Sequence, residues 1–187
     1  QVVDARYGRL DLDNRSEVGR GLLGRTLSWL SPGATVEEKP LDETLLLLSD
    51  IPGVAVTGTL KPGHEVGTSD LAVEVTDQPR VASAAWVDNH GNRFTGRARV
   101  GGAVSIYNPA HHGDVLSAEG ASSGEHMTYG RLSYQITLNG RGTRAGVAVS
   151  ALRYRLGGAL AQLDAHGTAG AASAWLSQPL VRSRGLN

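Results

Sequence analysis

The hydrophobic positions up to residue 75 follow two different spacings. A strand is predicted over residues 2–12, which include Val3, Tyr7 and Leu10, and a polar turn at residues 11–15 closes it. Asn14 followed by Glu17 has the spacing of a capping box, which predicts the start of a helix. Apolar residues then recur every three or four positions, at Val18, Leu22, Leu23, Leu27 and Leu30. The first predicted helix therefore has one buried face and ends at Ser31-Pro32-Gly33.

A second helix and two strands complete this part of the chain. The helix is predicted over residues 41–49 and is well buried, because its leucines include Leu41, Leu45 and Leu48 at helical spacing. Short strands are predicted at residues 54–60 and 69–75, separated by a loop rich in proline and glycine. The predicted order is strand, helix, helix, strand, strand.

After residue 81 the helical spacing disappears and apolar residues alternate with polar ones. In the clearest strand, Ala98, Val100, Gly102, Val104 and Ile106 alternate with Arg97, Arg99, Gly101, Ala103 and Ser105. In the next clearest, Leu132, Tyr134, Ile136 and Leu138 alternate with Arg131, Ser133, Gln135 and Thr137. Weaker strand patterns cover residues 115–121, 144–154 and 168–176. Turn-forming segments separate these strands, at 122–125, 139–142 and 157–166, so an up-and-down meander is predicted.

Two polar segments flank the first of these strands. The preceding segment contains Asp88, Asn89, His90, Gly91 and Asn92, and the following one contains Asn108, Pro109, Gly113 and Asp114. Because asparagine and glycine tolerate positive φ, the preceding segment predicts a tight turn between two strands.

The sequences of these turns closely resemble those of the two-partner secretion transporters, which are the haemolysin secretion/activation proteins of Gram-negative outer membranes. Their first barrel hairpin has the pattern D-N-x-G-N-x-x-T-G-x-x-R, followed by N-P and G-D. Residues 88–99 follow that pattern, and the segments at 129–134, 154–158, 163–169 and 179–187 also resemble the family. Residues 48–54, which include Ile51-Pro52-Gly53, and residues 60–71 resemble the second POTRA domain of these transporters.

The resemblance implies an α+β POTRA domain, with the order β-α-α-β-β, over residues 1–77. It implies that residues 78–187 are an antiparallel β meander of about six strands, part of a transmembrane β-barrel in the outer membrane, with the POTRA domain in the periplasm. The family has a further POTRA domain and a plug helix upstream, and its barrel continues beyond residue 187. The chain is therefore expected to be an internal fragment.

The function that the resemblance implies is translocation of a large secreted exoprotein, a haemolysin, an adhesin or a contact-dependent toxin. The POTRA domain captures the unfolded N-terminal secretion domain of this client, and the barrel forms the pore. No enzymatic activity, cofactor or metal is expected, and outer-membrane lipid is the other partner. Two alternatives remain, a barrel-assembly factor of the same superfamily and a soluble α+β binding protein.

Candidate site residues follow from this interpretation. An extended client segment can add to a strand edge, so the candidate client-binding residues are Val54, Ala55, Val56, Thr57, Gly58, Thr59 and Leu60. The candidate pore-lining residues are Arg97, Arg99, Ser105, Arg131 and Gln135, which belong to the polar faces of the two clearest strands. The same arginines also suit any solvated sheet. Membrane-interface belts or core packing both suit the aromatic residues Trp86, Tyr107, Tyr134, Tyr154 and Trp175.

The composition argues against several other classes of function. The 187 residues have a formal net charge of zero, which gives no general attraction to nucleic acid, and no cysteine, which excludes disulfides and thiolate metal sites. No apolar run is long enough for a membrane helix, and Gln1-Val2-Val3 does not resemble a signal peptide. A metal site at His111, His112 and Asp114, with Asp88 and His90 upstream, is disfavoured because adjacent histidines on a strand point to opposite faces. No serine lies in a nucleophile motif.

Overall fold

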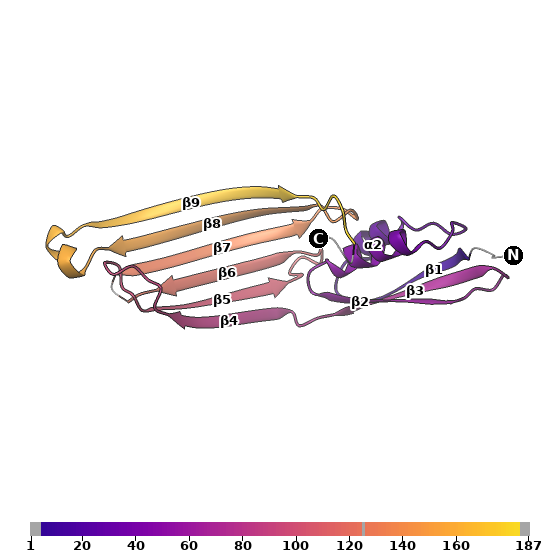
Figure 1. Cartoon of the computed structure of the whole chain (residues 1–187), viewed down its shortest axis with the longest axis horizontal. Coiled ribbons are helices and arrows are strands. Elements are labelled where there is room, and N and C mark those ends of the chain that lie inside the picture. Colours follow the sequence, from indigo (N-terminus) through magenta and orange to yellow (C-terminus); the bar gives the residue numbers. More distant parts are fainter. Residues whose placement is uncertain (1–4, 125, 184–187) are drawn as a thin grey trace.

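The computed structural model describes residues 5–124 and 126–183. A small unit of helices and strands lies at one end of a long antiparallel sheet, and the strands of both parts run along the long axis of the molecule (Figure 1). We call residues 5–77 the N-terminal unit and residues 78–183 the strand unit. Val2 and Val3 of the first predicted strand, Glu125 of a predicted turn and residues 184–187 lie outside the described residues.

The N-terminal unit has the predicted order of elements. They are β1 (Arg6–Arg15), α1 (Arg20–Leu27), α2 (Glu38–Ser49), β2 (Val54–Pro62) and β3 (Thr68–Asp77). β1 pairs in parallel with β3, and β2 pairs with β3 in antiparallel fashion, which gives the strand order β1-β3-β2. The last strand of the unit is therefore its central one, and β2 is an edge strand.

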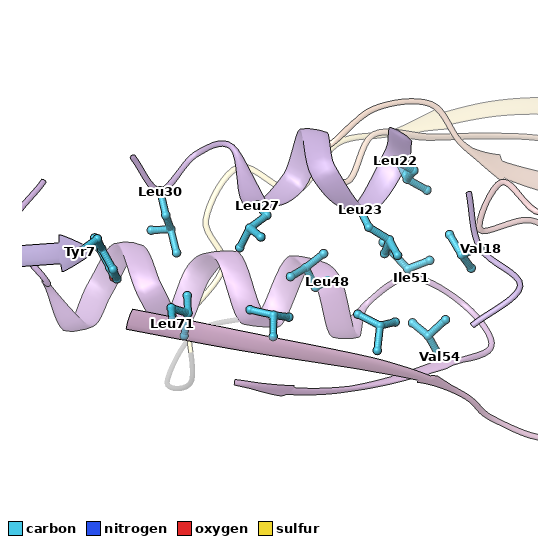
Figure 2. Close-up of a cluster of buried hydrophobic side chains, with 12 residues drawn as sticks. Tyr7, Val18, Leu22, Leu23, Leu27, Leu30, Leu48, Ile51, Val54 and Leu71 are labelled. Atoms are coloured by element: carbon cyan, nitrogen blue, oxygen red, sulfur yellow. The ribbon is translucent and has the colours of Figure 1, made fainter. Parts of the chain in front are cut away.

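Both helices cover one face of this sheet. Buried side chains of α1 point toward α2 and the sheet, and Leu71 meets them from β3 (Figure 2). Leu23, Leu48 and Val75 have no exposed surface. Leu71, Val73 and Val75 of β3 are buried on the face that the helices cover, and the residues between them lie on the other face of the sheet. The predicted buried face of the first helix is confirmed at Leu22, Leu23 and Leu27, whereas most of the predicted well-buried α2, including Leu45, is only half-buried.

Several boundaries differ from the sequence prediction, most of all those of β1 and α1. β1 continues through residues 11–15, which were predicted as a turn, and the capping box is wrong. Asn14 lies within β1, where its Oδ1 accepts from the Ser16 N–H at 2.9 Å and its Nδ2 donates to the Val18 carbonyl at 2.8 Å. The first helix is capped by Gly19 without a side-chain hydrogen bond and ends at Leu27.

A bulge in β1 has no counterpart in the alternating pattern. Its register with β3 shifts between Tyr7 and Leu10. The Arg9 N–H donates to the Asp70 carboxylate at 2.7 Å, and a Cβ at Gly8 would lie 2.2 Å from the same carboxylate. Glycine at this position therefore allows Asp70 to approach the main chain and pin the bulge.

The strand unit is an up-and-down meander, as predicted. Its strands are β4 (Val81–Asp88), β5 (Arg99–Tyr107), β6 (Val115–Ser122), β7 (Met127–Thr137), β8 (Arg144–Arg155) and β9 (His166–Ser177), paired in sequence order (Figure 1). A short 3₁₀ helix, η1 (Gly158–Leu163), lies between β8 and β9. No helix among the described residues is long and apolar enough to cross a membrane.

The tight turn predicted before β5 is wrong. β4 ends at Asp88 and β5 begins at Arg99, so residues 89–98 form a long loop instead. Only Gly96 within this loop has a positive φ, whereas the asparagines do not. The loop is held by tertiary contacts, because the Gly157 N–H donates to the Phe94 carbonyl at 2.7 Å. Arg97 and its neighbour Ala98 lie in this loop rather than in the strand.

We propose that the N-terminal unit is an independent domain over residues 1–77, and this predicts its behaviour when expressed alone. The fragment should be folded, because its twelve-residue core cluster lies entirely between Tyr7 and Val75. Circular dichroism and denaturant unfolding test this, and Leu48→Ala should lower its free energy of unfolding by about 2–5 kcal/mol. A random-coil spectrum of the unsubstituted fragment would contradict the boundary.

Candidate functional site

The outer edge of β2 presents main-chain groups that no strand of the described chain pairs with. β2 pairs with β3 in one register without a bulge. At the two ends of this ladder, the Gln78 N–H donates to the Gly53 carbonyl and the Gly63 N–H donates to the Thr68 carbonyl, both at 2.9 Å. Main-chain groups of an antiparallel strand alternate in direction, so the odd-numbered residues of β2 face β3.

The even-numbered residues of β2 therefore direct their N–H and C=O groups to the free edge. They are Val54, Val56, Gly58, Leu60 and Pro62. Pro62 has no N–H to donate, which agrees with a position on the open side. The seven candidate client-binding residues all lie in β2, and four of them carry these outward main-chain groups.

Strand pairing divides the side chains of the long sheet between two faces. Directly paired residues share a face, and faces alternate along each strand. Arg99, Ser105, Arg131 and Gln135 share one face, because Ser105 pairs with Ser117, which pairs with Ser133 on the same strand as both Arg131 and Gln135. We call this the polar face. Arg97 lies outside the strand, so its predicted place in this alternation is wrong.

Hydrogen bonds join neighbouring strands across the polar face. Arg99 forms two hydrogen bonds to the Asp88 carboxylate, at 2.9 and 3.1 Å, and thereby links β5 to β4. The hydroxyls of Ser105 and Ser117 lie 2.8 Å apart and link β5 to β6. Arg131 is exposed and makes no ion pair within the described chain.

The opposite face is apolar and open, and we call it the apolar face. Its exposed side chains are Val81, Val87, Val100, Val104, Leu132, Val147, Val149 and Leu176, which come from five of the six strands. Val87 is 79% exposed and Leu176 is 70% exposed. Such a continuous apolar surface normally has a covering partner.

Most of the aromatic residues are not on this apolar face. Trp86 pairs with Gly101 and Trp175 with Gly146, and each indole ring lies directly over its glycine on the polar face. Tyr107 shares that face. These three residues are therefore not placed to form a belt on the apolar face, whereas Tyr134 lies on that face, since it alternates with Ser133 and Gln135.

The two turn segments lie at opposite ends of β5. The segment before β5 is at the end far from the N-terminal unit (Figure 1). There, Asp88 accepts from the His90 N–H and Asn92 from the Phe94 N–H, while the Gly91 N–H donates to the Arg97 carbonyl. Asn89 lies in the same loop. These contacts shape the loop locally.

The second turn segment, residues 108–114, folds around a buried carboxylate. Asp114 has no exposed surface. Its carboxylate accepts from the Ala110 N–H at 3.0 Å, the His112 N–H at 3.1 Å and the Tyr134 hydroxyl at 2.9 Å. A buried carboxylate needs such donors, because its charge is otherwise costly to remove from water.

This loop also holds the N-terminal unit. The Asn108 side-chain amide donates to the Pro52 carbonyl at 2.7 Å, and the Gly19 N–H donates to the His111 carbonyl at 2.9 Å. Pro109 lies within the loop, half-buried. The sequence pattern identified these residues as a turn but not as a contact between the two units.

Gly113 lies at a close approach between this loop and the N-terminal unit. It has φ +62°, and a Cβ on it would be 2.8 Å from Ile51 and 3.3 Å from Leu22. A side chain at this position would therefore push the loop away from α1 and from the end of α2.

A second contact between the units involves the C-terminal end of α2. Asp50 caps this helix, and the Arg182 guanidinium donates twice to its carboxylate, at 2.7 Å each. Hydrogen bonding to Asp50 raises the pKa of Arg182. Arg144, at the start of β8, donates to the Asp50 carbonyl. The sequence prediction missed this cluster, although Asp50 and Arg182 both lie in segments that resemble the secretion family.

The three histidines of the disfavoured metal site lie at the two ends of β5. His90 is at one end, and His111 and His112 are at the other. Among the described residues, no group of three or more histidine, aspartate or glutamate side chains is placed to hold a metal ion.

Comparison with known proteins gives a family match and several relatives. Residues 67–165 match the family model described as haemolysin secretion/activation protein ShlB/FhaC/HecB. The chain is 29% identical, over 184 residues, to the heme/hemopexin transporter protein HuxB of Haemophilus influenzae. The alignment covers 97% of this chain and 33% of HuxB. The chain thus spans about a third of the length of the curated relatives that it matches.

Solved structures with a similar fold include two CdiB proteins. CdiB from Escherichia coli superposes with a TM-score of 0.69 at 19% identity, covering 95% of this chain and 34% of that one. CdiB from Acinetobacter baumannii gives 0.63 at 22% identity, covering 96% and 35%. BamA from Haemophilus ducreyi, lacking POTRA domains 1–3, gives 0.63 at 14% identity, covering 91% and 32%. The fold is therefore that of a POTRA domain followed by strands of a β-barrel.

The role of Asp114 in shaping the junction loop is testable by hydrogen exchange. Asp114→Ala removes the acceptor of the Ala110 and His112 amides, and a hydrogen bond to a charged group contributes about 1.5–3 kcal/mol. Exchange at these two amides should accelerate by at least about tenfold, since 1.4 kcal/mol corresponds to a factor of ten.

Glu119→Ala is the matched control for this experiment. Glu119 is an exposed carboxylate on the strand that follows Asp114, so its removal should leave both amides protected. Equal protection in the Asp114 variant and in the control would show that the loop does not depend on the carboxylate.

Proposed function

Since this chain belongs to the ShlB/FhaC/HecB family of haemolysin secretion/activation proteins, we propose that it is part of an outer-membrane transporter that exports a large exoprotein. The N-terminal unit lies in the periplasm and binds the client while it is unfolded. The strand unit contributes the first strands of the barrel through which the client passes. Members of this family act with a secreted partner protein, and the proposal extends this to the present chain.

The observation that carries the proposal is the separation of the two faces of the long sheet. One face is covered with exposed valines and leucines, and the other carries Arg99, Ser105, Arg131 and Gln135. In a membrane barrel the apolar side contacts lipid and the polar side lines a water-filled interior. A soluble binding protein, in contrast, would need a second layer over the apolar face.

The free edge of β2 is the proposed client-binding site. An unfolded segment that pairs with β2 forms main-chain hydrogen bonds, which require no particular side-chain sequence. This suits a transporter that must accept a long and varied polypeptide. The four residues with outward main-chain groups, Val54, Val56, Gly58 and Leu60, are the proposed contacts.

This function involves binding and guidance rather than catalysis. We propose that the chain performs no enzymatic reaction and uses no cofactor or nucleic acid. A role in barrel assembly is the weaker candidate, because the family model that matches is that of the secretion proteins, whereas the likeness to BamA is one of fold.

Two neighbouring residues of β8 test the assignment of the faces. In a complete transporter that contains this chain, Val149→Arg should impair membrane insertion, because an arginine facing lipid costs about 2–4 kcal/mol at the bilayer midplane. Ser150→Arg places the same charge on the polar face and should insert normally. Heat-modifiable mobility of the barrel measures insertion, and the opposite result would reverse the two faces.

A proline substitution tests the edge of β2. Val56→Pro removes an outward N–H and leaves the ladder to β3 intact, so it should abolish export without unfolding the N-terminal unit. Val56→Ala retains the N–H and should export the client normally. Export is measured as exoprotein in the medium, with the barrel confirmed in the outer membrane. Undiminished export by the proline variant would place the client elsewhere.

A further inference from the structure

A cavity of about 410 Å³ lies on the polar face, at the end of the long sheet that meets the N-terminal unit. Pro52, from the loop between α2 and β2, forms part of its wall. The other walls come from β5, β6, β7 and β9 and include Tyr107, Arg131, Gln135 and Trp175. The cavity is therefore shared between the two units.

Its side chains suit an extended polypeptide. Tyr107 and Trp175 offer aromatic surfaces, and the Trp175 ring is held in place because it lies against Gly146 on the paired strand. The side chains of Arg131 and Gln135 make no hydrogen bond or ion pair within the described chain, so their polar groups are available. Guanidinium and amide groups bind main-chain carbonyls, and an amide also accepts from main-chain N–H groups.

The cavity lies close to the beginning of β2. Pro52 is in its wall, and β2 begins only two residues later, at Val54. A strand rises by about 3.3 Å per residue, so a segment paired with the beginning of β2 reaches the cavity within a few residues.

We propose that this cavity is the first subsite in the barrel for the extended client segment that leaves β2. The aromatic rings of Tyr107 and Trp175 contact the side chains of the segment, while Arg131 and Gln135 bind its main chain. The ligand is an unfolded polypeptide, recognised by its backbone. This inference rests on the function proposed above and adds a defined site to it.

Site-specific photocrosslinking tests the subsite. A photoreactive phenylalanine analogue replaces Ser133, which lines the cavity, in a complete transporter engaged with a client that is stalled by a folded C-terminal fusion. Leu132 is the matched control, because it is the adjacent residue of β7 and points to the apolar face. A transporter–client adduct from position 133 and none from position 132 is expected. Adding Val56→Pro should abolish the adduct.

The alternative results are distinguishable. If the client without the fusion is exported normally and position 133 gives no more adduct than position 132, the subsite is wrong while the transport function stands. If the complete transporter exports no client, the proposed function itself fails and the subsite with it. An adduct at 133 that persists in the Val56→Pro variant would overturn the path from β2 to the cavity.

Discussion

The arrangement of the two units depends on one buried carboxylate. Asp114 is fully removed from water, so it needs donors around it, and two of these are main-chain amides of its own loop. Satisfying the carboxylate therefore determines the shape of residues 108–114. That shape presents the Asn108 amide to Pro52 and the His111 carbonyl to Gly19. The N-terminal unit is held against the long sheet because this loop has a defined conformation.

The cluster around Asp50 adds a contact that comes from two other parts of the chain. Arg144 and Arg182 approach the end of α2 from the start of β8 and from the segment after β9. Cations are favourable at a helix C-terminus, where the unpaired carbonyl groups carry partial negative charge. Two segments from the same end of the sheet thus converge on the same helix end. This fixes the beginning of β2 relative to the polar face.

The proposed transport path follows from that fixed position. Strand edges bind main chains without regard to sequence, and unpaired guanidinium and amide groups on a sheet face can bind the main-chain carbonyls of a shorter segment. β2 offers the first kind of surface, and the cavity near Arg131 offers the second. The exposed apolar residues on the opposite face have no part in this path and are instead suited to lipid. Because side chains alternate along each strand, the sheet has two faces, and each face suits a different environment.

Local patterns in the sequence were sufficient for the order of elements. Periodicity identified the helices and the clear strands, because amphipathic elements must place apolar residues at the spacing of their own geometry. Turn residues identified the meander, and the sequence of residues 88–114 identified the family. The same alternation grouped Arg99 with Ser105 and Val100 with Val104, since the pleat of a strand allows no other arrangement.

Contacts between distant residues decided the rest. The bulge at Gly8 exists because Asp70 reaches across from β3, and residues 89–98 form a long loop because Phe94 is held by Gly157. β2 is an edge strand because β1 pairs with β3, and the sequences of these two strands do not predict that pairing. Asp50, Arg144 and Arg182 are far apart in the sequence and meet only in the folded structure. The sequence determined the elements and their faces by itself, whereas the tertiary structure alone decided which edges remained open and how the units met, because both depend on long-range pairing.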